Sequence, residues 1–417
     1  MRRLLENTSN ESWLRGGLDT ETPVDALIKS PHDEASDLST EPAPTSDPQR
    51  HNLSPAHPDL GDGRPFLNEP TRDFARETVR QDFAGALEKI TLDPPAITDD
   101  PSDATAALDQ ICAGADPWAA TDGLGRARII DEAADRLADQ RDALAGLIIR
   151  EAGKPWREAD ADVCEAIDFC RFYARHSLSL TSSRRLGRFT GELDQLTHIP
   201  RGPTAVISPW NFPLAITTGM TVAALVTGNP VVVKPAEQTP AIAAELVKVL
   251  HAAGVPESAL ALVVGDGPNV GAALVDDPRM ATIAFTGSRE VGLSILETAG
   301  KVPDGQDHVK QVICEMGGKN AIIVDASADL DQAVAGVRDS AFGYAGQKCS
   351  ACSRVIVHTD IYDVFLDRLV GASEALAVGD PRDPATDVGP VIDDDAAEKI
   401  HCYLEIAHHE GQPALVM

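Results

Sequence analysis

The sequence predicts an α/β protein in which a parallel sheet with helices on both faces is followed by a second α/β domain. Two observations support this fold class. From Thr204 onward, short β-branched runs such as TAVIS and PVVVK alternate with amphipathic stretches of helical length. Strands that alternate with helices in this way are typical of βαβ units. After KQVICE, which ends at Glu315, the alternation restarts with NAIIVD, and this restart predicts the second domain.

The chain before the sheet has three parts. The opening stretch MRRLLENTSNESWLR (residues 1–15) has the apolar spacing of a short amphipathic helix. Residues 16–62 carry few apolar side chains and many Pro, Asp and Glu, so burial cannot offset the entropy lost on ordering, and we expect a disordered acidic linker. The third part is globular, with one helix expected over 126–153 and another over 161–175.

The strands and helices of the two domains follow in a regular order. Strands are predicted over 204–208, 230–234, 261–265, 281–287 and 310–315, with helices up to Thr227 and over 240–254, 269–275 and 288–300. Each strand is a short apolar run bounded by turn residues, which is the pattern of a strand buried on both faces. In the second domain, strands are predicted over 320–325 and 354–358, and helices over 329–344 and from Tyr362.

Composition excludes several classes of protein. Asp and Glu number 65 against 36 Lys and Arg, which gives a net charge of −29, and such a surface repels nucleic acids and anionic lipids. No apolar run reaches the roughly 18 residues of a membrane span, and the N-terminus lacks the apolar core of a secretory signal. Seven cysteines, an odd number in a long chain, are typical of reduced thiols in the cytoplasm, and one could be a nucleophile.

Polar residues follow three of the predicted strands, at the edge where parallel sheets bind ligands. In VISPWNFP, Asn211 is either a turn former or an amide donor that stabilises an oxyanion. In FTGSREVG, Gly287 and Ser288 lie where a strand gives way to a helix; such turns are often purely structural, but their free N–H groups suit a pyrophosphate. In VVVKPAEQTP, Lys234 and Glu237 are either solvated charges or ligands of ribose hydroxyls.

Cys349 is the best candidate nucleophile among the cysteines. It follows Lys348 in GQKCSAC, and a polar, cationic setting lowers the pKa of a thiol, whereas Cys164 lies among apolar neighbours. Cys352 completes a C-x-x-C pair, but no second pair accompanies it, so we expect a small buried residue and no metal site. Glu315 precedes two glycines that permit close approach, and it is either an exposed carboxylate or a general base near the thiol.

Five segments follow one another between residues 208 and 351 in the order SPWNFP, KPAEQTP, FTGS, EMGGKN and GQKCSA. Together they resemble the aldehyde dehydrogenase superfamily. Within it, FLNEPTRDF (66–74), PWNFPLAI and AFGYAGQKCSACSRVIVH resemble the 1-pyrroline-5-carboxylate (L-glutamate γ-semialdehyde) dehydrogenase branch, and the likeness covers residues 64–417. The resemblance implies N-terminal helices with a Rossmann-type NAD-binding domain over 63–315 and a catalytic domain over 316–417.

The family mechanism implies roles for three residues. Cys349 would attack the aldehyde to give a thiohemiacetal, whose oxyanion the Asn211 side chain and the Cys349 N–H would hold. NAD would accept the hydride, and Glu315 would activate the water that hydrolyses the thioester. The implied activity is oxidation of L-glutamate γ-semialdehyde to L-glutamate in proline degradation. The alternatives are another semialdehyde as substrate, or an inactive fragment that retains at most NAD binding.

The resemblance also implies which residues contact the cofactor and the substrate. NAD is implied over NADP, because the carboxylate of Glu237 disfavours a 2′-phosphate. The implied cofactor contacts are Ile207, Ser208, Pro209, Trp210, Lys234, Glu237, Gly287 and Ser288. The implied substrate contacts are Phe212, Glu165 and Lys348, with Lys348 as a partner of Glu165.

The chain departs from the family pattern at both ends. Family members continue past the nucleophile through an E-I-F-G-P stretch, a Gly-rich substrate loop and a final strand used in dimerisation. None of these follows Cys349, so we expect a truncated catalytic domain, and a homo-oligomer only where the domain is complete. Residues 1–15 resemble the last helix of a proline dehydrogenase domain, in which Arg2 and Arg3 would bind the proline carboxylate. A piece of a bifunctional proline-utilisation protein is therefore expected, with no catalytic role for these two arginines.

Overall fold

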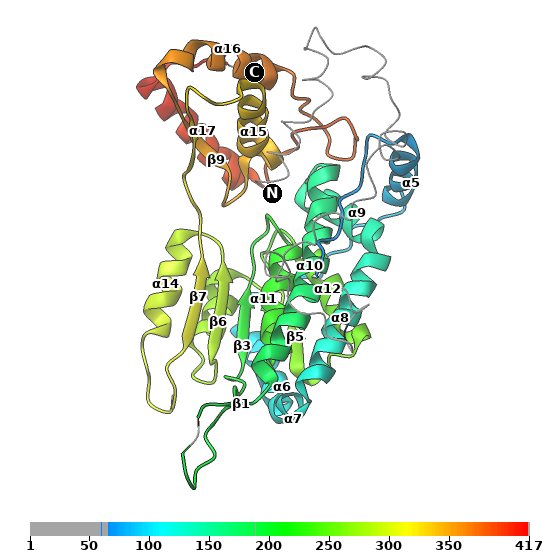
Figure 1. The fold of residues 1–417 in the computed structure, drawn as a ribbon, viewed down its shortest axis with the longest axis vertical. Helices are drawn as coiled ribbons and strands as arrows, with labels where there is room; N and C mark the ends of the chain where they lie inside the picture. Colours follow the sequence, from blue (N-terminus) through cyan, green and yellow to red (C-terminus); the bar gives the residue numbers. More distant parts are fainter. Residues whose placement is uncertain (1–59, 61–65, 188, 416–417) are drawn as a thin grey trace, which may run out of the picture. The chain divides into compact units, whose positions relative to one another are not determined.

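The computed structural model describes residue 60, residues 66–187 and residues 189–415 (Figure 1). The predicted helix over 1–15 lies outside the described residues, and so does the predicted linker over 16–62 apart from Leu60. We call residues 66–315 the N-terminal region and residues 316–415 the C-terminal region.

Helices precede the main sheet, as predicted, but one prediction about them is wrong. The helix expected over 126–153 is two helices, because the backbone at Gln140 leaves the helical conformation with φ −99° and ψ 11°. The second of them ends at Gly153, whose φ of 66° is left-handed and suits glycine. The helices are α5 (Glu77–Leu87), α6 (Pro101–Ala113), α7 (Ala115–Ala120), α8 (Gly123–Asp139), α9 (Arg141–Ala152) and α10 (Trp156–Thr181). A small antiparallel pair, β1 (Arg184–Arg185) and β2 (Gln195–Leu196), follows them.

Five parallel strands form the main sheet, which confirms the predicted α/β class. They are β3 (Thr204–Ile207), β4 (Val231–Lys234), β5 (Leu260–Leu262), β6 (Thr282–Thr286) and β7 (Gln311–Glu315), in the order β5-β4-β3-β6-β7. Between them run α11 (Ala215–Val226), α12 (Pro240–Ala253), η1 (Glu257–Ala259), η2 (Gly267–Gly271), α13 (Ala272–Asp276) and α14 (Arg289–Ala299). The order of strands along the chain reverses between β3 and β6, and such a switch point is where sheets of this kind bind ligands.

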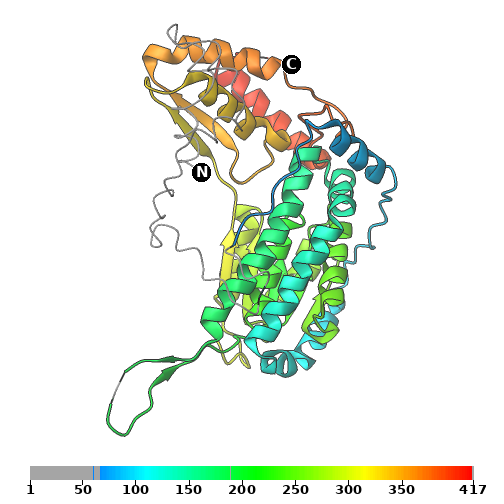
Figure 2. The same cartoon turned by 45° about the vertical axis from the view of Figure 1, so that its right-hand side comes forward.

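Alternate side chains of these strands enter two separate hydrophobic cores. Val206 and Val233 pack into the core formed with α8 to α12, whereas Ala205, Val232 and Ile283 pack into the core formed with α6, α13 and α14. The long helices α8 and α10 run side by side over one face of the sheet (Figure 2). Because both faces are covered, the strands read as continuous apolar runs, and this is why the sequence predicted them well.

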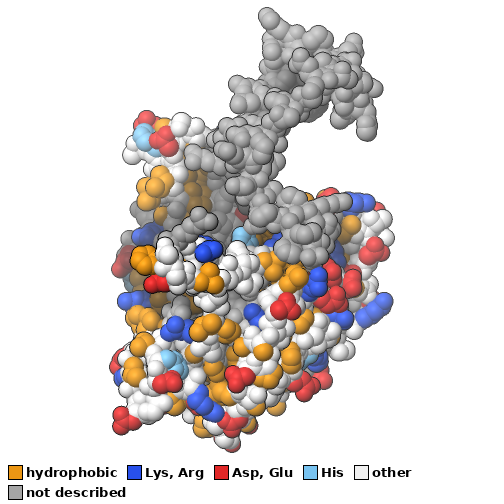
Figure 3. Space-filling model, turned by 60° about the horizontal axis from the view of Figure 1, so that its bottom comes forward, with side chains coloured by type: hydrophobic (Ala, Val, Ile, Leu, Met, Phe, Trp, Pro, Cys, Tyr) orange, Lys and Arg blue, Asp and Glu red, His pale blue; other side chains and the backbone are white. Residues whose placement is uncertain are grey.

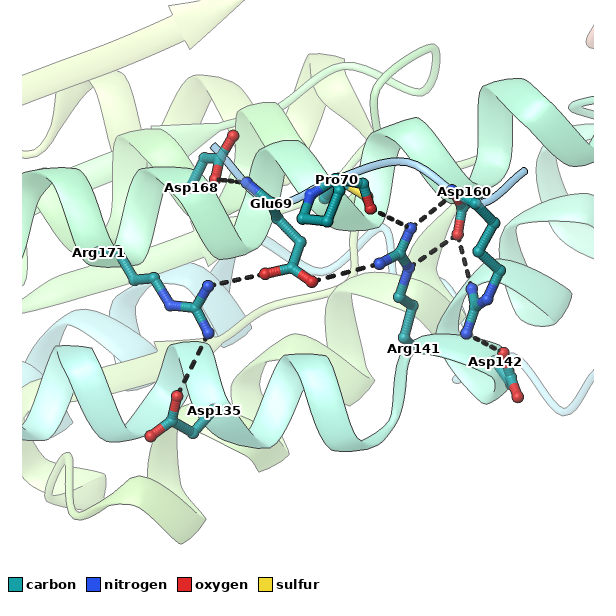
Figure 4. Close-up of polar contacts among 10 residues, drawn as sticks. Glu69, Pro70, Asp135, Arg141, Asp142, Asp160, Asp168 and Arg171 are labelled. Carbon is teal, nitrogen blue, oxygen red and sulfur yellow. Dashed lines mark hydrogen bonds and ion pairs between the residues drawn. The ribbon is translucent and has the colours of Figure 1, made fainter. Parts of the chain in front are cut away.

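An extended segment, residues 66–74, is fixed to the helices by a network of ion pairs (Figure 4). Its Glu69 carboxylate accepts from Arg171 at 2.7 Å and from Arg141 at 3.3 Å. Arg141 also donates to both oxygens of Asp160, at 2.8 and 2.7 Å, and Asp160 is almost fully buried. The same carboxylate accepts from Arg72, so two guanidinium groups lower the pKa of Asp160 against the effect of burial. The network ties this segment to α8, α9 and α10.

The C-terminal region is a smaller α/β unit. It contains β8 (Asn320–Val324), α15 (Leu330–Phe342), η3 (Gly343–Gly346), β9 (Cys352–Val357), η4 (Thr359–Ile361), α16 (Tyr362–Glu374) and α17 (Asp394–Glu410). The parallel strands β8 and β9 pair with each other, and α15 and α16 contribute to a small core around Val324, Val334, Val337 and Phe365. Side chains on the other face of the two strands stay open, with Ile323 76% exposed and Ile356 57% exposed.

The described surface has no dominant basic face in the view of Figure 3, where Lys and Arg are interspersed with Asp, Glu and apolar side chains. Among the described residues, we find no helix with the length and hydropathy that a membrane span requires.

Candidate active site

Four chain segments leave the main sheet at one edge. In the parallel register, Ile207 of β3 lies opposite Lys234 of β4 and Phe285 of β6. Thr286 at the end of β6 lies opposite Glu315 at the end of β7. The segments SPWNFP, KPAEQTP, FTGS and EMGGKN therefore begin at neighbouring strand ends, as the sequence predicted. This edge includes the switch point between β3 and β6.

A cavity of about 710 Å³ opens at this edge. Strand ends, the segment 267–276 and one side of α14 form its walls, and the lining includes Ile207, Lys234, Asn269, Gly271, Ser294 and Thr298. Cavities of this volume at a switch point are typical cofactor sites. Of the predicted cofactor residues, Ile207 and Lys234 contribute directly to the walls.

Lys234 is held at the cavity by its neighbours. Its ammonium lies 3.1 Å from the Pro235 carbonyl oxygen and 3.4 Å from a carboxylate oxygen of Glu237. The side chain of Lys234 is 3% exposed, and burial lowers its pKa, while the Glu237 carboxylate acts in the opposite direction. The pair thus presents one buried cation and one half-exposed carboxylate, which fits the two hydroxyls of a ribose.

Two further features fit a dinucleotide. The Ser208 hydroxyl is buried and, within the part of the chain that the structure describes, has no hydrogen-bond partner, so it can donate to a ligand. At Gly287 an added Cβ would lie 2.6 Å from the ring of Phe285, so the turn into α14 requires glycine. Ser288 begins this helix by accepting from the Val291 N–H at 3.3 Å, and a helix start with free N–H groups suits a phosphate. These residues therefore fit NAD.

One wall of the cavity, the segment 267–276, was not predicted as part of the site. The Asp266 carboxylate accepts from the N–H groups of Asn269 and Val270 at 2.9 and 3.1 Å and fixes the start of η2, four residues after the end of β5. The signal was present in the string GDGPNVG, since Asp, Gly, Pro and Asn together mark a turn after a strand.

Cys349 follows an unusual turn at the end of α15. Tyr344 and Ala345 have φ values of 52° and 54°, a left-handed conformation that is rare for residues other than glycine, and Gly346 has φ 72°. The side-chain amide of Asn211 donates to the carbonyl oxygen of Gln347 at 2.9 Å. The structure thus brings Asn211 to within two residues of Cys349, whose side chain is exposed.

The segment after Glu315 contacts the backbone of Cys349. The amide of Asn320 donates to the Cys349 carbonyl oxygen at 2.8 Å. A Cβ added at Gly318 would lie 3.0 Å from the same oxygen, so the two chain segments approach closely there. Glu315 itself ends β7 with an exposed side chain. The three predicted catalytic residues therefore lie on three segments that converge around residues 347–349.

One predicted contact is wrong. Lys348 pairs with Glu158, at 2.6 Å, and not with Glu165. Both glutamates lie on one face of α10, seven residues apart, and the turn that carries Lys348 approaches the N-terminal end of this helix near Gly343. The side chain of Glu165 is exposed, but neighbouring atoms still desolvate its carboxylate in part. This desolvation, and after it the charge of Asp162, raises the pKa of Glu165.

Cys164 and Cys352 are both buried, as the sequence predicted. Cys352 is buried, with its sulfur 3.2 Å from the Arg354 carbonyl oxygen. Burial raises the pKa of Cys164 to about 12, with a further contribution from Asp160. No group of three or more metal-ligating side chains occurs among residues 66–187 and 189–415.

Comparison with known proteins identifies the family. The model of the aldehyde dehydrogenase family matches residues 88–416. The chain belongs to this family. The match includes the main sheet, the cavity and the turn that carries Cys349, so the resemblance predicted from the five segments is confirmed.

Several proteins similar to this chain are named 1-pyrroline-5-carboxylate dehydrogenase. The chain is 42% identical over 381 residues to a 1-pyrroline-5-carboxylate dehydrogenase of Geobacillus sp. (strain WCH70), with 84% of this chain and 74% of the relative covered. A crystal structure of a 1-pyrroline-5-carboxylate dehydrogenase from Thermus with bound NAD matches with a TM-score of 0.79 and 37% identity, covering 85% of this chain and 74% of that one.

A longer protein also matches. The proline utilization A of Bdellovibrio bacteriovorus, in a structure inactivated by N-propargylglycine, gives a TM-score of 0.80 and 40% identity. The match covers 98% of this chain and 44% of that protein, so the chain spans less than half of the longer polypeptide.

Proposed function

We propose that this aldehyde dehydrogenase oxidises L-glutamate γ-semialdehyde, the open form of 1-pyrroline-5-carboxylate, to L-glutamate with NAD as the cofactor. The observation that carries the proposal is the contact between the Asn211 amide and the Gln347 carbonyl oxygen, at 2.9 Å. It joins a strand end of the cofactor edge to the turn that carries the exposed thiol of Cys349. Similar proteins named 1-pyrroline-5-carboxylate dehydrogenase, at 42 to 49% identity, support the choice of substrate.

The proposed chemistry gives each of three residues one task. The Cys349 sulfur attacks the aldehyde carbon and forms a thiohemiacetal, while the Asn211 amide and the Cys349 N–H stabilise the oxygen that gains negative charge. NAD, when bound, supplies the acceptor for the hydride that leaves this carbon. Glu315 takes a proton from the water that attacks the resulting thioester, which releases L-glutamate and the free thiol. Covalent capture therefore separates oxidation from hydrolysis.

The residues proposed to hold NAD surround the cavity at the sheet edge. Lys234 and Glu237 would hold the adenosine ribose, and the Glu237 carboxylate would reject the 2′-phosphate of NADP. The turn at Gly287 and Ser288 would hold the pyrophosphate. The strand end formed by Ile207, Ser208, Pro209 and Trp210 would border the nicotinamide half.

The proposed substrate contacts are Phe212, Glu165 and Lys348. The ion pair with Glu158 leaves Lys348 in place beside the nucleophile, but it removes the proposed contact between Lys348 and Glu165. Glu165 therefore acts alone in this proposal, as a carboxylate that can face the amino group of the substrate.

We also propose a division of the chain and a set of partners. Residues 63–315 would form the N-terminal helices with the NAD-binding domain, and residues 316–417 the catalytic domain, in accord with the separate cores of the two regions. The segments 1–15 and 16–62 would link this unit to a proline dehydrogenase domain. The wider coverage of this chain by the proline utilization A structure, 98% against 85% for the Thermus enzyme, supports that link. A cytoplasmic location is proposed with it, and a homo-oligomer where the full catalytic domain is present.

A second candidate function is NAD binding without turnover. The open face of the C-terminal region favours it, because Ile323 and Ile356 are more than half exposed in the domain that carries the nucleophile. An incompletely covered sheet can hold its loops less firmly than a closed one.

The test is NADH formation by the purified chain with 1-pyrroline-5-carboxylate and, in parallel, with succinate semialdehyde. We expect turnover with the first and at least about tenfold lower kcat/KM with the second. Cys349→Ala should lower turnover by about 10³-fold or more without weakening NAD binding in calorimetry. A preference for succinate semialdehyde would exclude the proposed substrate, and NAD binding without any turnover would favour the second candidate.

A further inference from the structure

A buried ion pair lies next to the two loops that meet at the site. The Lys154 ammonium lies 2.8 Å from a carboxylate oxygen of Asp162, and both side chains are 0% exposed. Fully buried lysine is rare, and an ion pair away from water gives little net stability because desolvation costs as much as the attraction returns. Stability alone therefore does not account for this pair.

The ammonium lies against two aromatic rings from the two loops that meet at the site. The Phe212 ring centroid is 4.0 Å from the Lys154 ammonium, and the Tyr344 ring centroid is 5.1 Å from it. Phe212 directly follows Asn211, and Tyr344 precedes Cys349 by five residues. A desolvated cation attracts the faces of both rings. One side chain thus contacts the loop of the amide donor and the loop of the nucleophile.

The same block holds both loops through hydrogen bonds. The second carboxylate oxygen of Asp162 accepts from the Ala215 N–H at 2.7 Å, directly after SPWNFP. The Tyr344 hydroxyl donates to the Ala152 carbonyl oxygen, two residues before Lys154, at 2.6 Å. The end of α9 and the start of α10 therefore anchor each loop once through a hydrogen bond and once through the cation.

The nucleophile loop requires such support. Left-handed conformations at residues such as Tyr344 and Ala345 are unfavourable, and they persist only where the surroundings hold them. The ring of Tyr344 contacts Lys154 and its hydroxyl donates to Ala152, and both contacts help to hold Tyr344 in this conformation. The position of Gln347, and with it that of Cys349, depends on the turn.

We propose that Lys154 is a positioning residue, which acts through Phe212 and Tyr344 to fix the Asn211 loop and the Cys349 loop relative to each other. Asp162 holds the ammonium in place through the ion pair. The effect on turnover rests on the proposed function, whereas the effect on the two loops does not.

The first experiment is hydrogen exchange by mass spectrometry on the full chain and its Lys154→Met variant, which keeps the side-chain length but removes the charge. We expect about tenfold faster exchange in residues 209–215 and 343–349, with exchange in β4 and β6 unchanged. In NADH formation, kcat should fall about tenfold while the Kd for NAD stays the same. Lys248→Met, an exposed change on α12, is the matched control and should alter neither loop.

A second pair of variants separates the cation contact from general packing. Tyr344→Phe keeps the ring beside Lys154 and loses only the hydrogen bond to Ala152, so exchange in residues 343–349 should lie between the parent rate and the rate of Tyr344→Leu, which loses both contacts. In residues 343–349, the double variant of Lys154→Met and Tyr344→Leu should exchange no faster than Tyr344→Leu alone, because that change already removes the contact between Lys154 and this loop. Unchanged exchange in both loops would overturn the proposal. So would faster exchange spread evenly over the chain in Tyr344→Leu, even if Lys154→Met does not fold.

Discussion

The N-terminal and C-terminal regions hold the residues of the candidate site in different ways. In the N-terminal region, strands with fully buried residues such as Val233 and Ile283 end directly at the cofactor cavity. In the C-terminal region, helices cover one face of two strands, and Ile323 on the other face is 76% exposed. The proposed cofactor residues are thus placed by a packed core, whereas Cys349, the proposed nucleophile, is placed by contacts that reach across to the N-terminal region.

Three polar contacts to this turn act beside the ring contacts of Tyr344 with Lys154 and Trp210. Asn211 donates to the Gln347 carbonyl oxygen, Glu158 pairs with Lys348, and Tyr344 donates to the Ala152 carbonyl oxygen. Each one joins the turn around residues 343–349 to an element of the N-terminal region. The site therefore depends on the well-packed N-terminal region and on contacts from that region to the less covered C-terminal region.

Thiol reactivity gives the largest expected contrast between the regions. Iodoacetamide should modify Cys349 about 10³-fold faster than Cys164 near neutral pH, because Cys349 is exposed, whereas burial raises the pKa of Cys164 to about 12 and leaves little thiolate. Modification of Cys164 should keep rising about tenfold per pH unit beyond about pH 9, where an ordinary thiol levels off, since its thiolate forms only near its own raised pKa.

Peptide mass spectrometry after timed alkylation measures both rates. Cys402→Ser is the control, because it removes another exposed thiol without touching the site. Equal rates at Cys164 and Cys349 would show that the packing of the two regions does not differ in the way described.

The strands and the residues at their ends could be predicted from sequence because the N-terminal region is so regular. Short apolar runs such as VVVK, bounded by Pro230 and Pro235, are typical of a strand buried on both faces, and the register of parallel strands then brings Ile207, Lys234 and Glu315 to one edge. The prediction needed only local pattern and the geometry of parallel sheets.

The remaining features depend on tertiary contacts that leave no local pattern. The break at Gln140 has no glycine or proline to mark it, and the apolar spacing continues through it. Glu158 and Glu165 lie on the same face of α10, so the sequence alone could not tell which of them meets Lys348. The burial of Lys154 could not be predicted either, since the string GKP is typical of a helix end.

Core substitutions should reveal the second contrast. Ile283→Ala in the main sheet removes a fully buried side chain and should lower the free energy of unfolding by about 2–5 kcal/mol. The matched change Ile323→Ala, on the open face of β8, should alter it by no more than about 0.5 kcal/mol. Urea unfolding followed by tryptophan fluorescence compares the two. A loss of similar size at Ile323 would mean that the open face is covered in solution.

The smallest effect comes from a single contact between the regions, and it tests the correction to the predicted ion pair. Glu158 and Lys348 are 24% and 19% exposed, so solvent screens the pair in part, and a double-mutant cycle of Glu158→Gln with Lys348→Met should give a coupling energy of about 0.5–1 kcal/mol. The matched cycle with Glu165→Gln should give none, because Glu165 lies farther along α10 and Lys348 already has its partner. Added salt should shrink the first coupling and leave the second at zero. A coupling with Glu165 instead would place the turn that carries Cys349 farther along α10 than the contact with Glu158 allows. It would contradict the contacts found between this turn and the N-terminal region.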